Sequence, residues 1–193
     1  MAETADELGA WAMTTPGTSK YPPGQTALIA KIPEAEPLVG HWRSQLDSVA
    51  SDGVPAHVTI LYPFLDHDRL DDTVIGQLGT LIGAHPAFHV RFQRCGRFPG
   101  VLYLAPSPDQ PFRALTDAVA ERWPEAPPYE GQFTEITPHL TVAHQQESQL
   151  LDRVEAELAD TLPMAAHVHE IHLLVSDGSR WREDRTFALR GHI

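Results

Sequence analysis

Two short segments with the same pattern, a histidine and a threonine separated by one apolar residue, constrain this chain more than any other feature. The first contains His57 and Thr59, and the second contains His139 and Thr141. Prolines and β-branched residues around both segments predict short strands. Residues two apart on a strand share a face, so each histidine should lie beside its threonine, with the apolar neighbours in the core. If the two strands lie near one another, two imidazoles and two hydroxyls meet in one cleft.

A single His-x-Thr pattern arises often by chance, whereas two copies in similar apolar contexts carry more weight. The alternative is that both histidines are structural and half-buried, with their ring nitrogens satisfied by neighbours, because histidine is commonly intermediate in burial. The residues alone leave both interpretations open.

Three longer segments resemble a known family. Residues 57–64 and 138–143 resemble the paired signature of the two-histidine phosphoesterase superfamily, which includes 2′-5′ RNA ligase-like proteins and cyclic nucleotide phosphodiesterases. Residues 98–106 resemble the middle of the RNA ligase-like branch, and the resemblance covers roughly residues 25 to 190. It implies two antiparallel sheets that line a central cleft, with helices outside, and a reaction that needs no metal.

The order of the predicted elements agrees with two lobes. Each half of the chain contributes one His-x-Thr strand with helices between strands, which indicates a pseudo-twofold internal repeat. We expect a bilobal α+β fold, with a flexible N-terminal extension over residues 1–24 and a single phosphoesterase-like domain over residues 25–193. Apolar spacing predicts helices over 34–50, 71–82, 111–123 and 147–162, and strands over 25–32, 56–62, 87–95, 101–105, 134–143, 167–175 and 185–190.

Composition limits the partners. The chain has 14 basic and 26 acidic residues and a formal net charge of -12. A protein that binds a long nucleic-acid backbone needs an excess of lysine and arginine to neutralise phosphates. We therefore expect a small nucleotide or an RNA end as the partner, and no duplex nucleic acid. No apolar run is long enough to span a membrane and the first residues are acidic where a signal peptide would be basic, so we expect a cytoplasmic protein without membrane contact. We also expect a monomer.

The paired motif suits general acid and base catalysis. Free imidazole titrates near pH ~6.5, so two histidines can hold opposite protonation states at neutral pH. Our hypothesis is that His57 and His139 are the general acid and base on a 2′,3′-cyclic phosphate or a 2′-5′ linkage. Thr59 and Thr141 bind the phosphate, and no metal or other cofactor takes part. Which histidine is the acid stays open.

The competing hypothesis is a binding module that uses the same cleft for a nucleotide or an RNA end without turnover. Both histidines and both threonines are present, which favours an enzyme. Two further residues are candidates for substrate binding. Tyr103 could stack on a base, and Arg97 could reach a phosphate.

Two other sets of residues have chemical potential. His167 and His169 share a strand face and could bind a metal, but His172 falls on the other face and no third ligand is evident. The chain has one cysteine, Cys95, which excludes an internal disulfide and suits a small buried hydrophobe better than a nucleophile. We favour neither set as the functional site.

Overall fold

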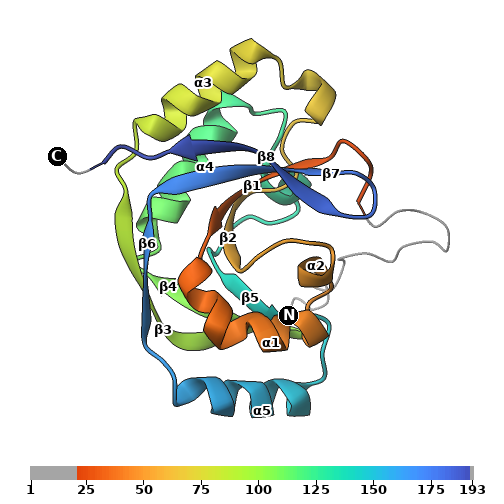
Figure 1. Ribbon diagram of the computed structural model, residues 1–193, viewed down its shortest axis with the longest axis vertical. Coiled ribbons are helices and arrows are strands. Elements are labelled where there is room, and N and C mark those ends of the chain that lie inside the picture. Colours follow the sequence, from red (N-terminus) through yellow and green to blue (C-terminus); the bar gives the residue numbers. More distant parts are fainter. Residues whose placement is uncertain (1–20, 192–193) are drawn as a thin grey trace, which may run out of the picture.

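Two four-stranded antiparallel sheets organise the structure, a computed structural model that describes residues 21–191 (Figure 1). The first sheet has the order β2-β1-β7-β8, formed by Thr26–Lys31 (β1), His57–Leu61 (β2), Glu170–Ser176 (β7) and Trp181–Ala188 (β8). The second has the order β5-β4-β3-β6, formed by Phe88–Phe98 (β3), Val101–Ser107 (β4), Leu140–Ala143 (β5) and Met164–Val168 (β6). The predicted α+β fold is confirmed.

The two motif strands lie where the sheets meet. β2 is an edge strand of the first sheet and β5 is an edge strand of the second, and the two edges contact each other. Val58 and Ile60 of β2 are buried, while His57 and Thr59 on the opposite face are only half-buried. Leu140 and Val142 of β5 are fully buried in the same way. The predicted alternation therefore holds in both strands.

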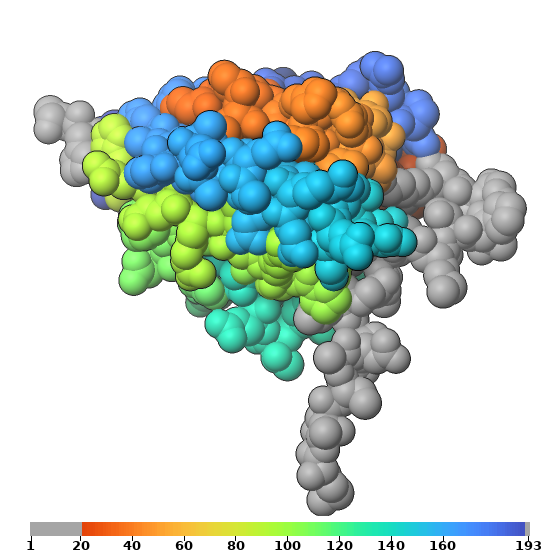
Figure 2. All heavy atoms as spheres, turned by 90° about the horizontal axis from the view of Figure 1, so that it is seen from below, coloured from red at the N-terminus to blue at the C-terminus, as the bar shows by residue number. Residues whose placement is uncertain are grey.

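Helices cover the outer faces of the sheets. They are Glu36–Leu46 (α1), Ser48–Ser51 (α2), Asp72–Gly83 (α3), Gln110–Arg122 (α4) and Ser148–Ala159 (α5). α3 packs against β8, α4 against β2, and α5 against β3 and β4. α1 contacts β5, so it lies on the second sheet although it leads into a strand of the first. Figures 1 and 2 show α1 and α5 side by side on one face of the molecule.

One predicted helix is wrong in detail. The pattern over residues 34–50 predicts a continuous helix, but the chain forms a 3₁₀ turn at Pro33–Ala35, then α1, then the short α2. Asp47 is extended between α1 and α2, and its carboxylate accepts the backbone N–H of Val49 as the N-cap of α2. An N-cap residue has non-helical backbone angles, which explains the break.

The predicted strand over residues 167–175 is also wrong. It divides at His169 into β6, which pairs with β3 in the second sheet, and β7, which pairs with β1 in the first. The apolar pattern continues across the division because both strands bury residues, so periodicity alone could not reveal it. The last strand begins earlier than predicted, at Trp181, because a turn at Asp177–Arg180 closes the β7-β8 hairpin.

The predicted extension falls largely outside the described residues. Residues 1–20 are not described, whereas residues 21–24 pack against the first sheet. Tyr21 is buried, and the backbone N–H of Gly24 donates to the carbonyl of Ser176 at 2.8 Å. Cys95 is half-buried on β3, where burial raises the pKa of its thiol to about 11, so the thiol stays protonated at neutral pH. No helix among the described residues is long and apolar enough to cross a membrane.

Candidate active site

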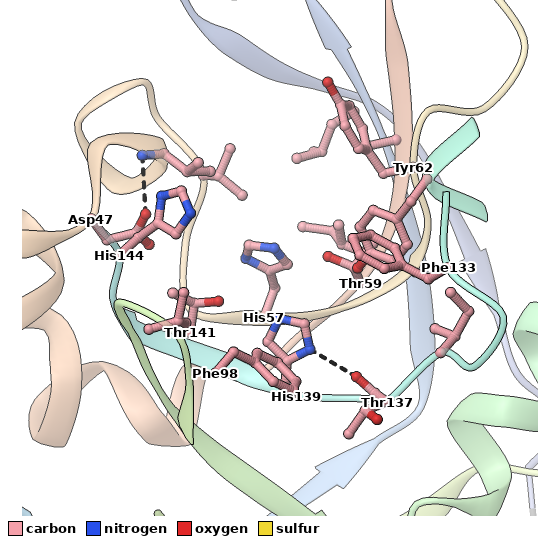
Figure 3. Close-up of a pocket in the computed structure, with 18 of the residues that line it drawn as sticks. Asp47, His57, Thr59, Tyr62, Phe98, Phe133, Thr137, His139, Thr141 and His144 are labelled. Carbon is pink, nitrogen blue, oxygen red and sulfur yellow. Dashed lines mark hydrogen bonds between the residues drawn. The ribbon is translucent and has the colours of Figure 1, made fainter. Parts of the chain in front are cut away.

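A cavity of about 230 Å³ brings the two motifs together between the sheets. His57 and Thr59 of β2 line it, as do His139 and Thr141 at the start of β5 (Figure 3). The two imidazoles lie next to each other in the centre of the site, with a threonine on either side. The tertiary structure therefore places all four predicted residues in one cleft.

Each imidazole is hydrogen-bonded to the backbone carbonyl two residues before it. His57 Nδ1 lies 2.7 Å from the carbonyl oxygen of Pro55, and His139 Nδ1 lies 2.8 Å from the carbonyl oxygen of Thr137. A carbonyl only accepts hydrogen bonds, so Nδ1 must carry the hydrogen in both rings. The neutral tautomer therefore leaves the lone pair on Nε2, which is the nitrogen available to a ligand.

Burial sets the charge of both histidines. Desolvation lowers the pKa of His57 to about 4, with a further contribution from the nearby Arg43, whereas Asp47 raises it slightly. Desolvation also lowers the pKa of His139, and the neighbouring His144 contributes in the same direction. Both imidazoles are therefore neutral at pH 7 when the site holds no ligand. A bound phosphate would raise both pKa values, because a nearby negative charge favours the imidazolium form.

Tyr103 lies next to the site, on the same sheet face as Thr141, but does not line the cavity. It pairs with Thr141 across β4 and β5, and its ring stacks on Phe98 with 4.5 Å between ring centroids. Its centroid is 5.4 Å from that of His139, so the ring supports the imidazole from the side. The close packing depends on Gly96, because a Cβ atom at this position would overlap the phenol ring.

Arg97 also lies outside the cavity. Its guanidinium contacts Asp152 at 2.8 Å and Glu155 at 2.5 Å, both on α5. Its neighbour Phe98 lines the cavity, and successive residues of a strand point to opposite faces, so Arg97 points toward the outer helix. The strand parity of β3 relative to the cleft was not evident from the sequence.

Sequence reasoning missed a buried ion pair in the wall of the site. Arg43 near the end of α1 donates to Asp47 through Nε at 3.2 Å and through Nη2 at 3.0 Å. Both side chains are almost fully buried, and Asp47 lines the cavity. The spacing of four residues indicates that the two side chains can pair on a helix, but such pairs are normally exposed. Nothing in the sequence indicated that this one is buried beside His57.

Tyr129 is a second residue that the sequence did not single out. It lines the cavity from the proline-rich loop at Pro128–Gly131, and burial raises the pKa of its phenol to about 12. Tyr129 and Glu130 both have positive φ, at 50° and 57°. Consecutive left-handed residues other than glycine are uncommon and cost energy, and they cluster at functional sites. The backbone N–H of Tyr129 donates to the carbonyl of Tyr62 at 2.6 Å, which holds this conformation.

An apolar wall closes the side of the cavity next to the first sheet. Three aromatic rings meet there edge to face, with centroid separations from 5.2 to 6.4 Å, namely Tyr21, Tyr62 and Trp181. Aliphatic side chains continue the wall, namely Ala27, Ile29, Val54 and Leu174. Among the described residues that line the cavity, Asp47 and Glu135 are the acidic ones, and none is a lysine or an arginine.

The three histidines near β6 and β7 do not converge. The rings of His167 and His169 stack at 5.6 Å, and that of His167 also stacks on His89 at 4.5 Å. His172 is buried elsewhere, between Glu170 and Glu183. Within residues 21–191, no group of three or more histidine, cysteine, aspartate or glutamate side chains is arranged to hold a metal ion.

Comparison with solved structures defines the class of fold. A crystal structure of E. coli LigT in complex with 3′-AMP has a TM-score of 0.59 at 17% identity, and the match covers 87% of this chain and 99% of LigT. A structure of LigT with NADP+ has a TM-score of 0.55 at 18% identity, covering 88% and 99%. A crystal structure of a phosphoesterase has a TM-score of 0.57 at 17% identity, with the same coverage. The chain therefore has the LigT fold.

A family model identifies the family itself. The model of the 2′-5′ RNA ligase superfamily matches residues 32–180, most of the chain and both motifs. The protein belongs to the 2′-5′ RNA ligase superfamily, and the resemblance of its paired motifs to the two-histidine phosphoesterases is confirmed. None of the curated proteins matches the sequence.

Proposed function

We propose that this protein is a metal-independent phosphoesterase that opens 2′,3′-cyclic phosphates or cleaves and joins 2′-5′ phosphodiester linkages. His57 and His139 are the general acid and base, and Thr59 and Thr141 bind the phosphate. The observation that carries the proposal is the matched arrangement of the imidazoles. Each donates through Nδ1 to a backbone carbonyl two residues upstream, and both line one cavity.

Hydrolysis of a cyclic phosphate uses one imidazole in each protonation state. The neutral imidazole accepts a proton from water at Nε2 as the water oxygen attacks phosphorus. The bond from phosphorus to one ribose oxygen breaks, and the protonated imidazole donates its Nε2 proton to that oxygen. The threonine hydroxyls donate to the nonbridging oxygens, where negative charge develops. Joining a 2′-5′ linkage is the same step with a ribose 5′-hydroxyl in place of water.

The charges of the cavity favour a small substrate. A polynucleotide binder needs cationic side chains along the phosphate path, whereas the described lining of this cavity contains acidic side chains and no lysine or arginine. The apolar wall suits a nucleoside body beside a single phosphate. E. coli LigT has been crystallised with 3′-AMP, ATP and NADP+, which supports a small nucleotide or an RNA end as the ligand here.

Hydrolysis assays in the presence of EDTA test the proposal. The substrates are 2′,3′-cyclic mononucleotides and short 2′-5′ oligonucleotides, and the enzymes are the wild type and the His57→Ala, His139→Ala double variant. We expect turnover by the wild type and its loss in the double variant. His167→Ala, which removes an exposed histidine, is the matched control and should keep full activity.

Two outcomes contradict the proposal. If the double variant retains activity, the reaction does not depend on His57 and His139. Nucleotide binding without turnover by the wild type identifies the competing function, a non-catalytic nucleotide or RNA-end binding module.

A further inference from the structure

An arginine holds the backbone just before each of the two motif histidines. Arg43 Nη2 donates to the carbonyl oxygen of Val54 at 3.2 Å, and Arg113 Nη1 donates to the carbonyl oxygen of Ile136 at 2.5 Å. Val54 is three residues before His57, and Ile136 is three residues before the second motif histidine. The same backbone position is therefore held in both halves of the site.

Both arginines are themselves fixed by an aspartate four residues away. Arg43 pairs with Asp47 at the end of α1, and Arg113 pairs through Nε with Asp109 at 2.8 Å at the start of α4. A planar guanidinium can bind a carboxylate on one side and a carbonyl on the other, with little freedom left. Each aspartate thus orients the arginine that reaches the backbone.

The held carbonyl is adjacent to the one that binds the imidazole. In the first half, Arg43 holds the carbonyl of Val54, and the next carbonyl, that of Pro55, accepts from His57 Nδ1. In the second half, Arg113 holds the carbonyl of Ile136, and the next carbonyl, that of Thr137, accepts from the imidazole. Consecutive carbonyls belong to neighbouring planar peptide units, so once the first is fixed only the φ and ψ of the residue between the two units set the direction of the second. These angles are restricted in both halves, because the ring of Pro55 fixes φ and Thr137 precedes a proline.

Secondary structure does not supply this restraint. β2 begins at His57 and β5 begins at Leu140, so both pairs of carbonyls precede the strands. Pro55 has no backbone N–H, and residues 132–139 form no helix or strand. In the first half Arg43 shares this role with Glu36, because the N–H of Ala56, which lies in the same peptide unit as the Pro55 carbonyl, donates to Glu36 Oε1 at 2.6 Å. In the second half Arg113 is the side-chain donor that the described structure shows at the preceding carbonyl.

We propose that Arg43 and Arg113 are positioning residues for the two motif histidines. By holding the preceding backbone, each keeps Nδ1 protonated and presents Nε2 to the substrate phosphate. The inference rests on the proposed function for its catalytic consequence, but the tautomer of each imidazole is a property of the ligand-free protein. The two ideas can therefore fail separately.

Electrostatic effects differ between the halves and must be separated from positioning. His57 faces Arg43, Asp47 and His139, whose charges act on its pKa in addition to burial. For His139, the neighbouring titratable groups are His57 and His144, and no arginine contributes to the shift of its pKa. Arg113 therefore gives the cleaner test, because its removal changes backbone positioning without a direct charge effect on the imidazole.

The first experiment uses Arg113→Met in the full chain, with Arg122→Met on the same helix as the matched control. Side-chain ¹⁵N NMR of the ligand-free protein reports the tautomer of each histidine. We expect the His139 signal to move toward the Nε2-protonated tautomer in Arg113→Met and the His57 signal to stay unchanged. We expect kcat to fall about 10- to 100-fold with KM within about twofold, because small misplacements of catalytic groups have effects of this size.

Conservative replacement provides a rescue. Arg113→Lys can donate to the carbonyl of Ile136 but cannot also bind Asp109 through a planar fork, so it should recover part of kcat and part of the wild-type tautomer. Arg122→Met should match the wild type in both measurements.

A second pair of variants addresses Arg43. Arg43→Met leaves the Asp47 carboxylate buried without its partner and is expected to reduce the stability of the folded protein. The double variant Arg43→Met, Asp47→Leu removes the hydrogen bond to the Val54 carbonyl without leaving an uncompensated buried charge. The double variant should shift the His57 tautomer and leave His139 unchanged.

Unchanged tautomers and unchanged kcat in Arg113→Met and in the Arg43 double variant overturn the inference. If the wild type shows no turnover but the variants still shift the histidine tautomers, the positioning role stands and the proposed function is rejected.

Discussion

The two halves of the site use the same local geometry in different surroundings. The Arg43–Asp47 pair beside His57 is 3% exposed at both side chains, whereas the Arg113–Asp109 pair, which holds the backbone before His139, is 35% and 36% exposed. In both halves an arginine holds one carbonyl and the imidazole binds the next. The internal repeat therefore preserves the arrangement of the histidine and not the burial of the residues that support it.

The difference in burial between the two ion pairs indicates which arginine contributes to folding as well as to the site. Separating a buried ion pair leaves an uncompensated charge in the interior, which is costly. A half-buried pair such as Arg113–Asp109 keeps more contact with water, so its loss should change stability less. Arg43 should therefore contribute to folding and to the site, whereas Arg113 should contribute mainly to the site.

The histidines themselves should show no such difference. His57→Ala and His139→Ala are each expected to reduce kcat by about 10²- to 10⁴-fold, because each removes one of the two proton-transfer groups. Single-turnover kinetics on a 2′,3′-cyclic nucleotide measures both effects. If one variant retains nearly all of its activity, the two halves are not functionally equivalent and the two-histidine mechanism is wrong.

Stability should separate the two arginines. Arg43→Met is expected to reduce the free energy of unfolding by about 3–5 kcal/mol, because it leaves Asp47 charged and buried. Arg113→Met should cost less than about 1 kcal/mol. Urea denaturation of both variants measures the difference. Equal losses would show that burial does not distinguish the two pairs.

The support behind His139 can be broken without touching the imidazole. Gly96→Ala places a methyl group against the ring of Tyr103, which packs on His139, and should cost about 1–3 kcal/mol and lower kcat. Gly76→Ala on α3 is the matched control, because a Cβ atom there meets nothing within 4 Å. It should stabilise the protein by about 0.5–1 kcal/mol. If Gly96→Ala behaves like Gly76→Ala, the packing of Tyr103 does not matter.

The dependence of stability on pH should include both halves. Burial lowers the pKa of both histidines, so the unfolded chain binds more protons than the folded one once the pH falls below about 6.5. Stability should therefore decrease on acidification, for His57 down to about pH 4. Urea denaturation at pH 7 and pH 5 should show a smaller decrease in His57→Ala than in the wild type. The control His167→Ala should keep the wild-type pH dependence.

Local pattern predicted the parts of the site that depend on strand parity. The histidines and threonines of β2 and β5 share one face, as period-two alternation requires, and the motifs also indicated the family. The local pattern could not predict how one side chain lies relative to an element that is distant in the sequence. Arg97 faces α5 because β3 presents this position on the opposite side of the sheet from the cavity, whereas Tyr103 shares the sheet face of Thr141 but packs against Phe98 and His139 and does not line the cavity.

Alternation and residue type within a few positions were enough to predict the class of fold, the two motif strands and the four central residues. They could not predict that α1 crosses to the second sheet, that Arg43 and Asp47 are buried beside His57, or that Arg113 reaches Ile136. The partners α1 and β5, and Arg113 and Ile136, are far apart along the chain, whereas the four-residue spacing of Arg43 and Asp47 predicts pairing but not burial. Both features arise from packing in three dimensions, which brings an arginine to the backbone of each motif and buries only one of the two ion pairs.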